Sequence, residues 1–96
     1  MSERMLYVDG GVPIEVTFSS RREMSAWVQE ITWLRNESNR MVEAYPNLPQ
    51  MTEIPANAQR EMRNWIFRAD AARERYGQTV PSVERAYSLM TNLLGI

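Results

Sequence analysis

The sequence predicts an α+β fold that is mainly helical, in which an N-terminal β-hairpin packs on a bundle of three helices. Three observations predict it: apolar residues alternate on both sides of a glycine turn, a long amphipathic stretch follows, and two more amphipathic stretches complete the chain. The 96 residues are 44% hydrophobic and 24% charged, which is typical of one globular domain. We therefore expect residues 1–96 to form a single domain.

Residues 4–18, RMLYVDGGVPIEVTF, predict the hairpin. Its turn falls at residues 9–11, DGG, because glycine accepts the positive φ that hairpin turns require. A three-residue loop pairs Val8 with Val12 and gathers the apolar side chains on one face. That face comprises Leu6, Val8, Val12, Ile14, Val16 and Phe18, and the opposite face comprises Met5, Tyr7, Glu15 and Thr17. Because an isolated two-stranded hairpin is only marginally stable in water, its apolar face is expected to pack on a helix.

Residues 20–44 predict the longest helix. Ser20 and Glu23 form a capping box that sets its start, and the helix ends before Pro46 because the residue preceding a proline disfavours helical geometry. Its inner stripe comprises Met24, Trp27, Val28, Ile31, Leu34, Val42 and Tyr45. Arg35 interrupts this stripe and either extends its charged end past the core or pairs with a buried carboxylate. We favour the first alternative, because arginine is rarely buried.

Residues 45–56, YPNLPQMTEIPA, predict an ordered connection that is not helical, because three prolines interrupt it. A second helix is predicted at residues 56–76, with Gly77 ending it, and a third at residues 80–94, with Pro81 in its first turn. Their inner faces comprise Ala58, Met62, Trp65, Ile66, Ala69, Ala72 and Tyr76 in the second helix and Val83, Ala86, Tyr87, Met90, Leu93 and Leu94 in the third.

The composition argues against an enzyme. The chain contains neither cysteine nor histidine, and all eleven basic residues are arginine. It therefore lacks the commonest zinc ligands, the commonest general base and any lysine that could form a Schiff base. Its carboxylates recur at spacings typical of solvated helix faces, so we predict no catalytic residue, no metal site and no cofactor. Neither a membrane-spanning segment nor a signal peptide is evident, so the expected location is the cytoplasm.

A degenerate helix-turn-helix offers an alternative function, DNA binding. Residues 69–89, ADAARERYGQTVPSVERAYSL, resemble this motif in outline, with alanines, a glycine turn and a second amphipathic helix. The recognition helix would carry only Arg85 against Glu84, and the net charge of the chain is −1. Because affinity for nucleic acid depends on basic residues that contact phosphates, we favour this hypothesis less.

Two aromatic side chains lie opposite the inner stripes of their helices and favour a protein-interaction module. Trp33 falls about 180° from Met24, and Phe67 falls at about the same angle from Ala58. They are either core residues between two layers or exposed anchors for a partner, since aromatic residues and arginine are enriched at binding interfaces. The partner-binding residues that we predict are Trp33, Phe67, Arg63, Glu37, Tyr45 and Pro46. The expected partner is a larger host or phage protein, and a second copy of the chain is the other candidate.

The stretch DGGVPIEVTFSSRREMSAWVQEI, residues 9–31, resembles the hairpin and following helix of phage head–tail joining proteins of the lambda W type. In that family too, a DG turn leads through an alternating strand into a capped helix. The family's helix before the hairpin has no counterpart here, and residues 45–96 have none in the family. The resemblance implies a phage origin and assigns no site residue. Small size and the absence of cofactor chemistry also suit phage-encoded inhibitors of host machinery as a class. The most concrete function that we predict is a phage-encoded inhibitor of a host protein complex, or an assembly factor.

Overall fold

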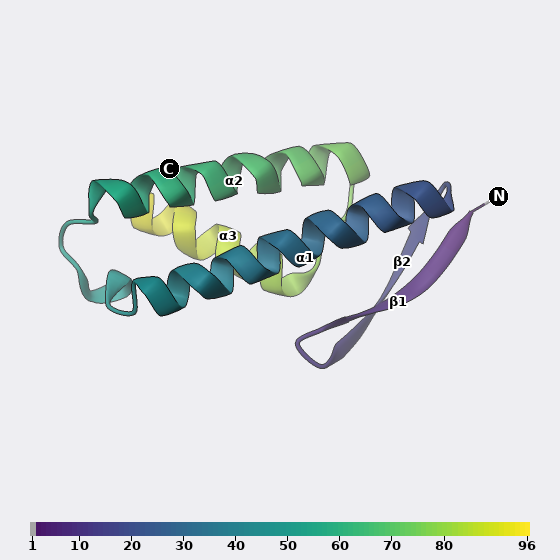
Figure 1. Ribbon diagram of the computed structural model, residues 1–96, viewed down its shortest axis with the longest axis horizontal. Coiled ribbons are helices and arrows are strands. Elements are labelled where there is room, and N and C mark those ends of the chain that lie inside the picture. Colours follow the sequence, from purple (N-terminus) through teal and green to yellow (C-terminus); the bar gives the residue numbers. More distant parts are fainter. Residues whose placement is uncertain (1) are drawn as a thin grey trace.

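The computed structural model describes residues 2–96 and has the mainly helical α+β fold that the sequence predicts (Figure 1). An antiparallel hairpin precedes three α-helices, and a short 3₁₀ turn lies between the first two helices. Helices α1 and α2 lie side by side with α3 behind them, and the hairpin lies against the N-terminal half of α1. The elements are β1 (Glu3–Asp9), β2 (Val12–Phe18), α1 (Arg21–Ala44), η1 (Leu48–Gln50), α2 (Ala56–Tyr76) and α3 (Pro81–Leu94).

The register of the hairpin differs from the predicted one. Gly10 and Gly11 have φ values of 58° and 87° and form a two-residue turn, beside which Asp9 pairs with Val12. Two adjacent residues with positive φ are typical of the type I′ turn, whose twist matches that of the flanking strands. The prediction of a three-residue loop was therefore wrong.

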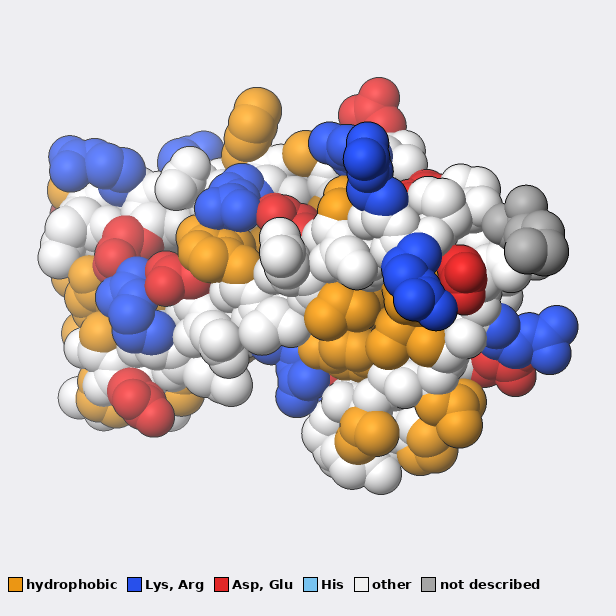
Figure 2. Space-filling model, turned by 45° about the vertical axis from the view of Figure 1, so that its right-hand side comes forward, with side chains coloured by type: hydrophobic (Ala, Val, Ile, Leu, Met, Phe, Trp, Pro, Cys, Tyr) orange, Lys and Arg blue, Asp and Glu red, His pale blue; other side chains and the backbone are white. Residues whose placement is uncertain are grey.

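This shift exchanges the two faces of β1, because side chains alternate along a strand. Tyr7 is buried, whereas Leu6 and Val8, which we expected inside, are 65% and 60% exposed. Strand β2 keeps its predicted faces except at Val12 beside the turn, which is 56% exposed. Apolar residues occupy both faces of β1, so their alternation could not select the register. Figure 2 shows the resulting hydrophobic side chains exposed on the hairpin below the helices.

The helix ends follow local signals in the sequence. Ser20 Oγ accepts a hydrogen bond from the Glu23 backbone N–H at 3.1 Å and caps the start of α1. Helix α1 stops at Ala44, just before the proline-rich connection. Gly77 follows α2 in left-handed geometry with φ of 69°, and Pro81 is the first residue of α3.

The three helices pack through their predicted apolar faces, with one exception. Trp27 on α1 is fully buried, and its indole N–H donates to the Gln78 carbonyl at 2.9 Å. Trp65 on α2 is also buried, and its indole N–H donates to the Leu34 carbonyl at 2.8 Å. Val42, which we expected inside, is instead 63% exposed. The apolar stripe of α1 therefore continues beyond the elements that cover it.

Asp9 is a carboxylate at the hairpin turn, only 3% exposed, that joins three elements. Its Oδ2 accepts a hydrogen bond from the Ser82 backbone N–H at 2.9 Å, and its Oδ1 accepts one from the Ser82 hydroxyl. Helix α3 has no side-chain cap from Val80, so Asp9 supplies the cap across the fold. Arg35 Nε lies 3.5 Å from Asp9 Oδ1. Arg35 thus pairs with a buried carboxylate, and our preference for the other alternative was wrong.

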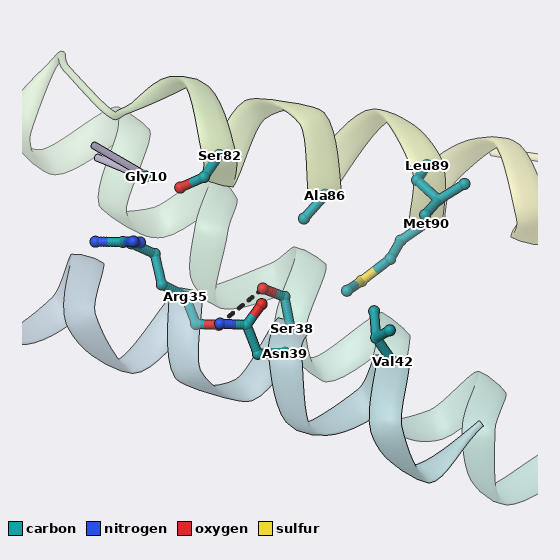
Figure 3. A pocket seen from close by; sticks show the side chains of 9 residues that line it. All are labelled: Gly10, Arg35, Ser38, Asn39, Val42, Ser82, Ala86, Leu89 and Met90. Atoms are coloured by element: carbon teal, nitrogen blue, oxygen red, sulfur yellow. Dashed lines mark hydrogen bonds between the residues drawn. The ribbon is translucent and has the colours of Figure 1, made fainter. Parts of the chain in front are cut away.

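The hairpin is too short to cover the whole of α1. A strand of seven residues spans about 23 Å, whereas a helix of 24 residues spans about 36 Å. The end of α1 that leads into the proline-rich connection therefore extends past the hairpin. There α1 faces α3 across an open groove (Figure 3).

Candidate protein-binding surfaces

A groove between α1 and α3 hollows the surface. Next to the hairpin turn it has a volume of about 330 Å³. Figure 3 shows side chains from both helices pointing into the space between them, with Gly10 of the hairpin at one end. The lining residues are Gly10, Arg35, Ser38, Asn39, Val42, Ser82, Ala86, Leu89 and Met90.

A second hollow of about 210 Å³ continues this groove toward the proline-rich connection. The two hollows share Ser38, Val42, Leu89 and Met90, so they form one continuous surface. The second hollow is the more apolar, and its remaining lining residues are Met41, Tyr45, Pro46, Leu48, Pro49, Met62 and Leu93. The groove therefore has a polar end at the hairpin and an apolar end at the connection.

Arg35 places a fixed positive charge at the polar end. Its Nη1 donates to the Tyr7 hydroxyl at 3.0 Å and to the Val8 carbonyl at 3.4 Å. The hydrogen bond to Tyr7, together with the charge of Asp9, raises the pKa of Arg35 above its ordinary value despite partial burial. The side chain is 29% exposed and lines the groove, with its guanidinium paired to Asp9.

Tyr45 and Pro46, two of the predicted partner-binding residues, line the apolar end. The Tyr45 hydroxyl donates to Glu61 Oε2 at 2.7 Å, and Arg40 Nη2 donates to Glu61 Oε1 at 2.7 Å. These hydrogen bonds hold the pKa of Glu61 below its ordinary value, and the contact with Glu61 raises the pKa of Tyr45. Glu37, a third predicted residue, accepts from Arg40 at 3.0 Å. Glu37 therefore belongs to an ionic network between α1 and α2 that holds Tyr45 at the groove wall.

The other predicted residues, Trp33, Phe67 and Arg63, lie on the side of the molecule formed by α1 and α2. Trp33 is half-buried, and the guanidinium carbon of Arg68 lies 3.6 Å from the centre of its ring. Arg68 also donates to both carboxylate oxygens of Glu30, at 3.1 and 3.0 Å. Phe67 is 74% exposed, and Arg63 is exposed beside it. Phe67 is thus an exposed aromatic residue, whereas Trp33 packs at the edge of the core.

Sequence reasoning missed the central groove residues. The apolar stripe of α1 placed Val42 in the core and no pattern singled out Leu89, yet Val42 and Leu89 are 63% and 47% exposed across the groove. The signal that could have revealed them is the polar pair in the stripe of α1, Arg35 and Ser38. A core-facing stripe that turns polar indicates a helix face that solvent reaches.

Residues 69–89, the candidate helix-turn-helix, comprise the end of α2, a four-residue connection and most of α3. Among the exposed residues of α3, Arg85 is the one that carries a charge. Within residues 2–96, potential metal ligands do not gather in groups of three, and no helix is long and apolar enough to cross a membrane. No protein-family model, curated protein or solved structure matches the chain.

Proposed function

We propose that the chain is a non-enzymatic protein-interaction module that binds an amphipathic helix of a larger protein in the groove between α1 and α3. The observation that carries this proposal is the exposure of Val42 and Leu89 on opposite walls of one continuous groove. Such exposed apolar side chains gain free energy when a partner covers them, at roughly 25 cal/mol per Å² of apolar surface. A groove between two helices suits a third helix, whose apolar face inserts between them.

The two ends of the groove specify the chemistry of the partner helix. At the apolar end, Tyr45 and Pro46 with Leu93 provide a hollow for bulky aliphatic or aromatic side chains. At the polar end, the guanidinium of Arg35 is paired with Asp9, and its remaining N–H groups can donate hydrogen bonds to an oxygen of the partner. We therefore expect apolar residues at i, i+3, i+4 and i+7 in the partner helix and a side chain that accepts hydrogen bonds at the end that contacts Arg35.

A library of displayed helical peptides tests this proposal and does not require the identity of the partner. Selection on the wild-type chain should enrich peptides with the stated pattern. Their dissociation constants should rise at least about tenfold for Val42→Glu and for Leu89→Glu, because each change puts a carboxylate on an apolar wall. The matched control is Leu6→Glu, an equally drastic change at an exposed apolar residue of the hairpin outside the groove.

Circular dichroism should show that all three variants keep the helical fold, because the substituted side chains are substantially exposed. Enriched peptides that bind Val42→Glu and the wild type equally well would overturn the groove as the binding site. Enrichment of peptides without an amphipathic pattern would overturn the proposed partner chemistry. The narrower roles of a phage-encoded inhibitor or an assembly factor stay predictions from the sequence.

A further inference from the structure

The outer face of α2 carries a second feature that the groove does not explain. Phe67, the most exposed large apolar residue of the fold, lies at the centre of this face. Exposed residues follow on both sides of it at helical spacing and form what we call the α2 stripe. The α2 stripe comprises Arg60, Arg63, Asn64, Phe67, Asp70, Ala71 and Glu74.

Charges along the α2 stripe are ordered by sign. Arg60 and Arg63 precede Phe67, whereas Asp70 and Glu74 follow it. Arg60, Arg63 and Glu74 form no ion pair with any other residue in the range 2–96. Asp70 has one long contact, 3.5 Å from Arg73, and its side chain is 52% exposed. Most of these charges are therefore available to a partner.

This order of charges is complementary to itself in the antiparallel direction. If two copies of α2 meet about a two-fold axis at Phe67, residues equally distant from Phe67 lie at the same height along the interface, and residues on the same side of Phe67 face one another. Arg60 and Glu74, seven residues before and after Phe67, lie nearly in line with it, so Arg60 of each copy faces Glu74 of the other. Counted at 100° per residue, Arg63 and Asp70 lie on one side of Phe67 and face each other, and Asn64 and Ala71 do so on the other side. We infer that a second copy of this chain binds the α2 stripe in an antiparallel, two-fold symmetric dimer.

Three physical contributions favour this arrangement. The two Phe67 rings bury each other at the symmetry axis, and paired aromatic rings attract one another beyond the gain from their burial. Each Arg60 meets the Glu74 of the other copy, so the ion pair occurs twice. Antiparallel helices also place each helix N-terminus beside the C-terminus of its partner, so the helix dipoles attract.

The size of the contact predicts a reversible dimer. Stable interfaces bury about 1,200–2,000 Å² in total, and one face of a single helix with one aromatic anchor offers less. We therefore expect a dissociation constant between about 10 µM and about 1 mM. None of the groove residues belongs to the α2 stripe, so both grooves stay open in the dimer. Such a dimer presents two grooves and binds a repeated or multimeric partner with increased avidity.

Sedimentation equilibrium at chain concentrations from about 1 µM to about 1 mM tests the dimer. The wild type should shift from the mass of one chain to that of two chains over this range. Phe67→Ala should raise the dissociation constant at least about tenfold. Val42→Ala, a matched truncation at an exposed apolar residue in the groove, should leave the constant unchanged.

A charge exchange distinguishes the two-fold geometry from other contacts. Arg60→Glu places a carboxylate opposite Glu74 of the other copy at both ends of the interface. Glu74→Arg likewise places a guanidinium group opposite Arg60 of the other copy. Each variant alone should therefore be monomeric, because like charges repel. A mixture of the two variants should form a heterodimer, because both opposed pairs are again of opposite charge. The double variant with both changes should also dimerise by itself.

Two results would overturn the inference. One is a wild-type chain that sediments as a single chain at about 1 mM. The other is a dimer that Phe67→Ala leaves intact or that the mixed charge variants do not restore. Circular dichroism of each variant provides the folding control. Arg60, Phe67 and Glu74 are exposed, so their substitution should not change the helical content.

Discussion

The two halves of α1 carry the same apolar stripe, but the hairpin covers this stripe only in the N-terminal half. In the N-terminal half the hairpin covers Trp27, which is fully buried beside Tyr7 and Phe18. In the C-terminal half Val42 is 63% exposed, and across the groove Leu89 is 47% exposed. The difference arises because the strands end before the helix does, as the lengths of β1 and α1 require. An amphipathic stripe thus builds the core where an element covers it and stays exposed to solvent where none does.

We expect the largest loss of stability from Trp27→Ala, in the covered half of α1. The change removes a fully buried indole, its contacts with the hairpin and its hydrogen bond to Gln78. We expect a loss of about 3–5 kcal/mol in the free energy of unfolding, measured by urea denaturation. Val42→Ala, in the open half of the same helix, should cost no more than about 0.5 kcal/mol. Similar losses for the two variants would contradict the division of α1 into a covered and an open half.

We expect a smaller loss of stability from changes at Asp9, which joins the hairpin turn to α1 and α3. Asp9→Ala removes the cap of α3 and leaves Arg35 with only part of its contacts. We expect a loss of about 1–3 kcal/mol in the free energy of unfolding, since caps and charged hydrogen bonds contribute about this much. Asp9→Asn should lose less, because asparagine still accepts the hydrogen bond from the Ser82 backbone N–H. If Asp9→Ala matched the wild type, the cap across the fold would not stabilise α3.

The smallest effect concerns the ionic network at the open half and depends on pH. Because folding lowers the pKa of Glu61, its contribution to stability is present above the ordinary glutamate pKa of about 4.3. The contribution is lost as the pH falls through the lower pKa of the folded state. As the pH falls from about 6 to about 3, the free energy of unfolding should therefore decrease less for Glu61→Gln than for the wild type. Urea denaturation at each pH measures this decrease.

The matched control for Glu61→Gln is Glu53→Gln, at an exposed glutamate that forms no ion pair within residues 2–96. This control should follow the wild type across the pH range. A Glu61→Gln variant with the same acid dependence as the wild type would show that the hydrogen bond from Tyr45 does not stabilise the open half.

The candidate sites were only partly predictable. Tyr45 and Pro46 were selected from the sequence and line the groove, and Phe67 was selected as a misplaced aromatic residue and is exposed. Trp33 was selected on the same ground, yet Arg68 covers its ring. The helical angle of a residue tells which side of its helix it occupies, but not whether a long side chain from a neighbouring helix reaches over it. Val42 was missed for the converse reason, because its angle is that of a core residue.

The sequence by itself determined where the helices begin and end and which side of each helix is apolar. Those features depend on neighbouring residues: Ser20 with Glu23 starts α1, Gly77 ends α2, and Pro81 starts α3. Such contacts span a few residues, so the pattern of residue types encodes them directly.

Only the tertiary structure decided the register of β1, the pairing of Arg35 and the open half of α1. Asp9 and Ser82 are 73 residues apart in the chain, and no local pattern marks one as the cap of the other. Strand β1 has apolar residues on both faces, so burying Tyr7 and Asp9 against the helices selected the face that points inward. The extent of the groove likewise followed from the lengths of elements that meet only after the chain has folded.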